Sequence, residues 1–253
     1  MTTFVAWDDV QATREQLGTP GSEILRTHFL KPDPRTREPQ AFLVEYAPAR
    51  ALRAHFHDVD EFQIVMAGEG MLGKHAIAPH AVHFASAFTP YGPIAAGAQG
   101  LSFLTLRARR DSAGPQLLPD KRQALADAPE RHPWQVSESV ELMHRGGSVQ
   151  TRPLPRLTGR RGLAAWVVDI PCDLSMQLPS AQGTGGRYVV VLRGSIRLDS
   201  RTVQAPSLAF ALAGAAPSNI ASGSGGAALI VLDFPDMSSI PRPEKKQDRR
   251  LIQ

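Results

Sequence analysis

The two halves of the chain repeat one order of apolar runs, glycines and prolines. Residues 61–68 (EFQIVMAG) and 187–194 (RYVVVLRG) are both apolar runs that end in glycine. Each is followed by a proline, a second proline-containing turn and another apolar run: Pro79, Pro90–Tyr91 and 101–106 in the first copy, and Pro206, Pro217–Ser218 and 228–233 in the second. One inserted residue in the second copy brings the two into line. The repeat predicts two copies of one fold in tandem.

Short apolar runs between turn residues are typical of β-strands, and this chain of 253 residues has 21 glycines and 21 prolines. We therefore expect an all-β protein. The expected strands are 23–30, 41–46, 62–67, 83–88 and 101–108 in the first half, and 163–170, 188–198, 207–212 and 228–234 in the second. A short helix is expected within 120–128, between the halves.

A cluster of metal-ligand residues lies at the start of the first apolar run. His55 and His57 are two residues apart, so in a strand their side chains leave the same face. Glu61 follows four residues after His57, and a bend between them would bring its carboxylate to the same point. Two imidazoles and one carboxylate are a ligand set for a divalent first-row metal with open coordination positions. The segment predicts a metal centre in the N-terminal half.

The spacing H-x-H, three residues, E, six residues, G resembles the first motif of the cupin family, and His55, His57, Glu61 and Gly68 fill its four positions. Cupins are double-sheet, jelly-roll β structures. The resemblance therefore implies an all-β chain of two tandem cupin barrels, a bicupin. It divides the chain into an N-terminal barrel with the metal site (1–110), a linker (111–139), a degenerate C-terminal barrel (140–235) and a charged tail (236–253). The alternative for the linker is a swapped segment that packs across the other barrel.

The second cupin motif, G, five residues, P-x-G, two residues, H, is degenerate. Pro90–Gly92 supplies its P-x-G, but Phe84 stands at the first glycine and Ala95 at the histidine. A rival register on Gly73 and Pro79 loses the second glycine and the histidine as well. The first register is preferred because the apolar run at 101–104 then follows as the next strand. Three of the four usual ligands are present, and water or substrate is expected to replace the fourth.

The second copy lacks the ligands. Ala181 and Gly183 stand at the positions of the histidines, and Arg187 stands at that of the glutamate. An arginine there would repel a cation. The C-terminal barrel is expected to be a structural or dimerising half, with an anion on Arg187 as the alternative.

Three further residues are candidates for catalysis. Tyr91 would ligate the metal, line the pocket or lie on a surface turn. Gln63 shares strand parity with Glu61, so its amide would orient a ligand or fill the core. His83 lies in an apolar strand and would be a substitute ligand, a general base or a core histidine.

The resemblance implies a metal-binding bicupin that acts on a small, oxygen-rich organic molecule. Fe(II) is the first expectation for the metal, with Zn, Mn and Ni as alternatives, and an Fe(II)-dependent dioxygenase is the first expectation for the activity. Isomerases, decarboxylases and hydrolases stay open, because the fold does not choose between them. The alternative is a barrel that binds a small ligand or metal without catalysis.

Composition argues against other classes of partner. The net charge is +4, the basic residues are dispersed and aromatic residues make up 6%, which disfavours nucleic-acid binding. No apolar run approaches the ~18 residues that span a membrane. The single Cys172 and the absence of a signal-like start lead us to expect a cytoplasmic protein. The expected partner is a small molecule, and the expected assembly is a homodimer.

Overall fold

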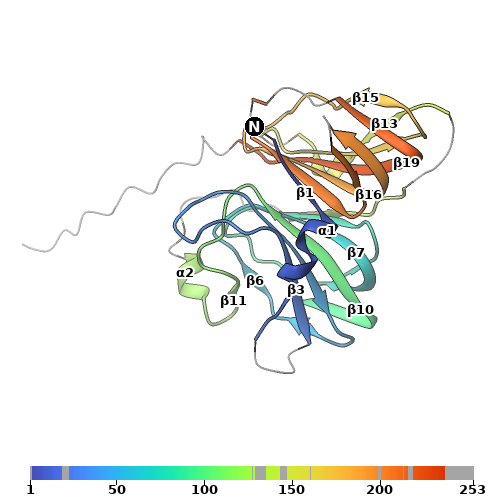
Figure 1. Cartoon of the computed structure of the whole chain (residues 1–253). Coiled ribbons are helices and arrows are strands. Elements are labelled where there is room, and N and C mark those ends of the chain that lie inside the picture. Colours follow the sequence, from blue (N-terminus) through green and yellow to red (C-terminus); the bar gives the residue numbers. More distant parts are fainter. Residues whose placement is uncertain are drawn as a thin grey trace, which may run out of the picture.

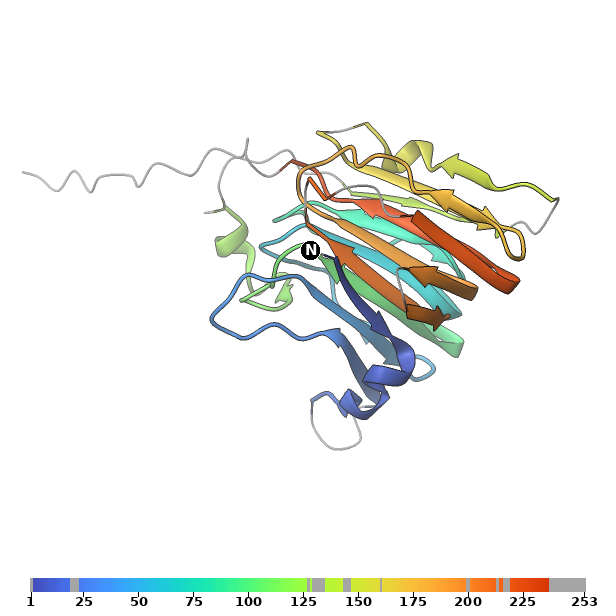
Figure 2. The same ribbon diagram turned by 45° about the horizontal axis from the view of Figure 1, so that its top comes forward.

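The computed structural model describes residues 2–18, 23–126, 128, 135–142, 147–159, 161–198, 201–212, 214–215 and 219–236. These residues form two β barrels that lie side by side, one coloured mainly blue to green and the other yellow to red (Figures 1 and 2). The all-β prediction and the tandem arrangement are confirmed. Of the expected charged tail at 236–253, only Asp236 lies among the described residues. No helix in the described part of the chain is long and apolar enough to cross a membrane.

The N-terminal barrel is built on one sheet whose main path runs β12-β9-β7-β10-β4-β3-β2, with β5 paired to β10 and β8 paired to β7. Two short strands, β6 and β11, pair beside it. The bounds are β2 Glu15–Gln16, β3 Ile24–Leu30, β4 Gln40–Tyr46, β5 Ala51–Leu52, β6 His55–Phe56, β7 Glu61–Leu72, β8 His75–Ile77, β9 Val82–Ala85, β10 Ile94–Arg107, β11 Gln116–Leu117 and β12 Gln135–Glu138.

The C-terminal barrel is built on a second sheet whose main path runs β1-β18-β16-β19-β14-β13, with β15 paired to β19 and β17 paired to β16. Its strands are β1 Thr2–Ala6, β13 Gln150–Pro153, β14 Ala164–Ile170, β15 Ser175–Gln177, β16 Arg187–Leu198, β17 Arg201–Gln204, β18 Ser207–Ala211 and β19 Asn219–Asp233. The helical segments are α1 Trp7–Val10, α2 Arg122–Ala126, η1 Gln11–Thr13 and η2 Pro155–Leu157. The expected helix within 120–128 is therefore α2.

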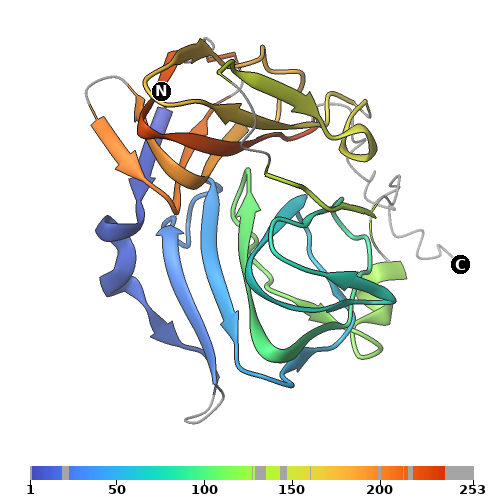
Figure 3. The ribbon, with the colours of Figure 1, turned by 90° about the vertical axis from the view of Figure 1, so that its right-hand side faces the viewer.

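Strand exchange ties the two barrels together and differs from the expected division of the chain. Strand β1 pairs with β18 in the C-terminal sheet, although residues 1–110 were assigned to the first barrel (Figure 3). Strands β11 and β12, within the expected linker, pair with β6 and β9 of the N-terminal barrel. Each added strand supplies hydrogen bonds to an edge that would otherwise stay unpaired.

The two barrels share one strand register. Phe62 pairs with Leu106 in the first sheet, and Tyr188 pairs with Leu232 in the second. The pairs Gly68–Leu101 and Gly194–Ala227 correspond in the same way, as do Leu72–Ile94 and Leu198–Ile220. The copies therefore align without the expected insertion: residues 101–106 correspond to 227–232, not 228–233.

Side chains alternate along the long central strands. Phe62, Leu106 and Tyr188 point into a core that both barrels share. The Tyr188 hydroxyl donates a hydrogen bond to the carbonyl of Arg107 across this boundary, at 2.9 Å. The intervening residues, Glu61 and Arg107 among them, face the interior of the N-terminal barrel. Strand period thus sends one face of β7 and β10 to the shared core and the other to the site described next.

Candidate functional site

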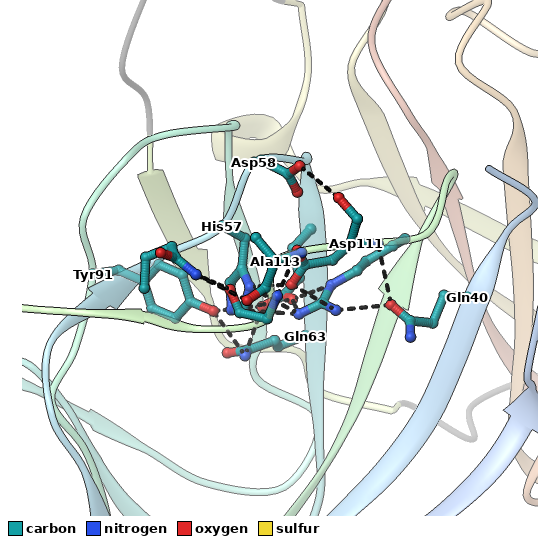
Figure 4. A network of polar contacts seen from close by, with 12 residues as sticks. Gln40, His57, Asp58, Gln63, Tyr91, Asp111 and Ala113 are labelled. Carbon is teal, nitrogen blue, oxygen red and sulfur yellow. Dashed lines mark hydrogen bonds and ion pairs between the residues drawn. The ribbon is translucent and has the colours of Figure 1, made fainter. Parts of the chain in front are cut away.

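The interior of the N-terminal barrel holds a cavity of about 290 Å³. Its walls are mainly apolar, with Phe42, Val44 and Phe103 among them. Its polar side chains come from β3, β4, β6, β7 and β10 and from the segments that follow β6, β9 and β10. Many of them form a connected network of hydrogen bonds and ion pairs (Figure 4). A cavity of this size and composition is typical of small-molecule sites.

The two histidines of the motif lie together and are both oriented through Nδ1. Their ring centroids are 5.1 Å apart. His55 Nδ1 lies 2.9 Å from the carbonyl oxygen of Arg53, and His57 Nδ1 lies 2.6 Å from Oδ2 of Asp111. Burial, together with the nearby charge of His57, lowers the pKa of His55 to about 4, so its imidazole is neutral near pH 7. When Nδ1 carries the proton of this neutral ring, Nε2 of His55 is unprotonated.

Tyr91 lines the cavity and touches the carboxylate of the motif. Its hydroxyl donates to Oε1 of Glu61 at 2.5 Å, and its ring lies 4.5 Å from that of His55. Burial raises the pKa of Tyr91 well above its usual value, and the charge of Glu61 adds to the shift. The phenol is therefore protonated. Of the three expectations for Tyr91, the pocket-lining one describes its position, and the surface turn is wrong.

The backbone corrects the register of the second motif. His80 and Phe88 have φ values of 69° and 56°, a region that favours glycine. A register that begins at His80 puts Phe88 at the second glycine and Tyr91 at the histidine. The preferred register placed Ala95 at the histidine position, but Ala95 pairs with Met71 on β7 and does not line the cavity. Tyr91 therefore stands at the fourth ligand position, which was expected to be open to water or substrate.

Arg107 occupies the space between these residues. Its Nε and Nη2 lie 2.6 and 2.5 Å from Oε2 of Glu61. Its Nη1 donates to Gln40 at 2.8 Å, and its Nη2 lies 3.3 and 3.4 Å from the two ring nitrogens of His57. Burial alone would raise the pKa of Glu61, but the charges of Arg107 and His57 and the hydrogen bond from Tyr91 lower it to about 2. Glu61 and Arg107 are thus a fully ionised, buried pair.

Gln63 and His83 take different places. Gln63 Nε2 donates to Oε1 of Glu61 at 2.9 Å, a position compatible with the predicted orienting role. His83 packs against the ring of Tyr91 at 5.1 Å between centroids and does not line the large cavity. Burial lowers the pKa of His83 to about 4. His83 therefore lies behind the site as a core histidine.

A divalent metal ion does not fit this arrangement. The described residues contain no group of three or more His, Cys, Asp or Glu side chains placed to hold one. Tyr91 and Gln63 occupy Oε1 of Glu61, and Arg107 occupies Oε2. A guanidinium stays protonated and has no lone pair to give a metal. The structure gathers the predicted ligands His55, His57 and Glu61, but an arginine neutralises the carboxylate where a cation was expected.

The C-terminal barrel holds the same pair with its charges reversed. Arg187 and Asp233 are register partners next to Tyr188–Leu232, and they form a bidentate ion pair at 2.6 and 2.9 Å. By register, Arg187 corresponds to Glu61 and Asp233 to Arg107. The cavity beside Arg187 measures only about 30 Å³. The alternative of a free anion on Arg187 is therefore not supported, and a buried cross-strand ion pair is part of both barrels.

Sequence reasoning missed Arg107, Asp111 and Gln40. Arg107 lies at the same strand parity as the cavity-lining Thr105, which is the one local signal for it. Asp111 and Gln40 reach the site from the ends of β10 and β4, and no local spacing shows this.

Comparison with known proteins identifies the type of fold. No family model and no curated protein matches the sequence. The solved structures similar to this chain include a candidate dioxygenase from Nostoc punctiforme (TM-score 0.60, 15% identity, 94% of this chain and 84% of that chain). They also include a pirin from Escherichia coli in complex with nickel(II) (TM-score 0.61, 10% identity, 93% and 100%) and a mutant oxalate decarboxylase from Bacillus subtilis (TM-score 0.58, 11% identity, 93% and 77%). The fold is that of a bicupin. At these identities the likeness fixes the architecture and leaves the chemistry to this chain's own residues.

Proposed function

We propose that the N-terminal barrel of this bicupin binds a small organic molecule and transfers a proton at His57 without a resident metal ion. The observation that carries the proposal is the Arg107–Glu61 ion pair, which satisfies the carboxylate at the point where the motif residues converge. With that carboxylate neutralised, the imidazoles of His55 and His57 are the candidate proton acceptors at the cavity. His57 is favoured because its Nδ1 is held by a carboxylate, that of Asp111, whereas Nδ1 of His55 is held by a backbone carbonyl.

Asp111 supports His57 as a proton acceptor. Its Oδ2 holds His57 Nδ1 at 2.6 Å, and its Oδ1 accepts the backbone N–H groups of Ala113 and Gly114, each at 3.1 Å. Burial alone would raise the pKa of Asp111, but the hydrogen bond to His57 and the charge of Arg107 hold it below its usual range. An ionised carboxylate behind Nδ1 fixes the tautomer and stabilises the imidazolium that forms when Nε2 takes a proton.

The reaction class that follows is proton abstraction next to a carbonyl, as in an isomerase, which was among the open expectations. Nε2 of His57 takes a proton from carbon, and the imidazolium returns it to the same or a neighbouring atom. Asp111 is a positioning residue in this scheme, because it acts through His57.

A metal-dependent enzyme, with an Fe(II) dioxygenase as its first form, is the second candidate. The observation that favours it is that both histidines are held through Nδ1, the arrangement that orients imidazole ligands in metal sites. It requires the Arg107 guanidinium to leave Glu61. The nickel complex of the structurally similar pirin is consistent with this candidate.

The test is solvent exchange at carbon. Protein treated with chelator is incubated in D₂O with a panel of 2-oxo acids and β-diketones, and loss of C–H signal is followed by NMR. We expect exchange without added metal, a loss of about 100-fold or more in His57→Gln, and no change in His75→Gln, whose side chain is exposed on β8. Exchange that requires added metal would favour the second candidate, and a His57→Gln variant that retains full exchange would contradict the proposal.

A further inference from the structure

A second arginine, Arg26 on β3, also lines the cavity. Its guanidinium carbon Cζ lies 4.7 Å from the ring centroid of Phe42, and Cζ of Arg107 lies 5.4 Å from the same centroid. One aromatic ring in the cavity wall therefore contacts two cations. Of these two cations, Arg107 forms a direct ion pair with a carboxylate, that of Glu61, and Arg26 does not.

Arg26 is half-buried, and its Nε is buried with no hydrogen-bond partner. Among the described residues no carboxylate lies within ion-pair distance of it. Its register neighbour Glu15 is engaged by His28 at 2.7 Å and by Lys31 at 3.9 Å. Burial lowers the pKa of Arg26, the nearby charge of Glu15 opposes that shift, and the charge of Arg107 adds to it. Buried polar groups of this kind normally have a partner.

Arg107 cannot supply the missing contact, because its donors already serve Glu61 and Gln40. The open partner of Arg26 therefore comes from whatever enters the cavity. A carboxylate matches a guanidinium in shape and charge. The rest of the molecule meets apolar walls, with Ile24, Val44 and Phe103 among them, in about 290 Å³.

We infer that the molecule bound in the N-terminal barrel is a small organic acid with an apolar body, whose carboxylate binds to Arg26. This inference names the ligand class and rests on the proposed function only in using the same cavity. It does not require a proton-transfer reaction. The alternative is that Arg26 packs over Phe42 as a solvated cation and takes no part in ligand binding.

The experiment compares acids with neutral amides of the same shape. Benzoate, cyclohexanecarboxylate and hexanoate are titrated into the full-length protein by calorimetry, alongside benzamide, cyclohexanecarboxamide and hexanamide. The expected result is that at least one acid binds about tenfold or more tightly than its amide, since a charge-assisted contact is lost in the amide. Arg26→Gln should remove this preference and Arg26→Lys should keep part of it.

The matched control is Arg35→Gln, because Arg35 is exposed and pairs with the exposed Asp33 away from the cavity lining. It should leave the preference unchanged, and circular dichroism checks that each variant is folded. Acids and amides that bind equally well, or an acid preference that survives Arg26→Gln, would overturn the inference while leaving the cavity as a binding site. Failure of all six probes to bind would overturn the inference and the small-molecule site together. The exchange assay on His57 is independent of both outcomes.

Discussion

The carboxylate of Glu61 on β7 and the guanidinium of Arg107 on β10 form an ion pair inside the N-terminal barrel, with Nε and Nη2 at 2.6 and 2.5 Å from Oε2. Arg187 and Asp233 occupy the corresponding register positions of the C-terminal barrel with the charges exchanged. The same location thus supports a buried ion pair of either polarity. Arg107 is therefore a structural ion-pair partner of Glu61.

Removing one member of this pair should destabilise the protein strongly. Arg107→Met leaves the ionised, buried Glu61 unpaired, and we expect it to lower the free energy of unfolding by about 3–5 kcal/mol. The double variant Arg107→Met/Glu61→Gln should recover part of that loss, because residue 61 then carries no charge to be left unpaired. Urea unfolding measures all three proteins. If Arg107→Met were as stable as Arg107→Met/Glu61→Gln, the account would be contradicted. The control is Arg35→Ala, which removes an exposed ion pair and should lower the free energy of unfolding by less than about 1 kcal/mol.

Removing Arg107 should also create metal affinity. In Arg107→Ala the carboxylate of Glu61 is released beside His55, His57 and Tyr91, a donor set suited to a first-row metal. We expect Ni²⁺ or Mn²⁺ to raise the thermal midpoint of the variant and to leave the wild type unchanged. Arg107→Gln is the second variant should alanine fold poorly, and adding His57→Ala should abolish the effect. If the metal ions raised the thermal midpoint of the wild type as much as that of the variant, the ion pair would not be what prevents metal binding.

Acid should destabilise the fold in two steps. Burial lowers the pKa of His55 and His83 to about 4 from the usual 6.5, so the unfolded chain binds more protons than the native state between these values. The free energy of unfolding therefore falls as the pH drops from 6.5 towards 4, by roughly 1–3 kcal/mol per group. Glu61, whose pKa is about 2 against 4.5, adds a loss as the pH drops from 4.5 towards 2.

Urea unfolding at pH 7.0 and pH 4.5 measures the histidine step. His83→Gln has no imidazole to charge at that position and should show a smaller difference between the two pH values than the wild type. His75→Gln, at an exposed position on β8, serves as the control. Equal differences in wild type and His83→Gln would show that His83 does not contribute.

The repeat makes a prediction about two equivalent glycines. Gly68 and Gly194 have φ values of 73° and 71°, and a Cβ at each would lie 2.2 and 1.9 Å from the carbonyl oxygen of Gly100 and of Gly226. Alanine at either position should therefore destabilise the protein by similar amounts, about 1–3 kcal/mol. Gly147→Ala, where a Cβ meets nothing within 4 Å, should be nearly neutral. A neutral effect at only one of the pair would argue against equivalent roles.

Much of the fold could be predicted from local pattern. The repeat and the alternation of side chains predicted the central strands of both barrels and placed Glu61 and Gln63 on one face of β7. A swapped segment within 111–139 was among the alternatives, but the partners of β12 and the exchange of β1 could not be predicted, because pairing between distant strands leaves no local signal.

The site was predictable in part. The spacing of His55, His57 and Glu61 brought them to one cavity as expected. The position of the fourth motif residue was assigned to Ala95 by mistake. His80 and Phe88 have the backbone conformation that is typical of glycine without being glycine, so the sequence no longer shows the motif. Arg107 changed the chemistry of the site through a contact between two strands, which no spacing along the chain shows.

The most direct test of the central claim is the metal content of the untagged wild-type protein. The protein is purified without chelators, incubated with Fe²⁺, Mn²⁺, Ni²⁺ and Zn²⁺ in turn, dialysed and measured by elemental analysis. Because Arg107 satisfies Glu61, we expect well below one equivalent of each metal per chain, with His57-dependent proton exchange intact in the same samples. About one tightly bound ion per chain that is lost in a His55→Ala/His57→Ala variant would contradict the account and establish the metal-dependent candidate.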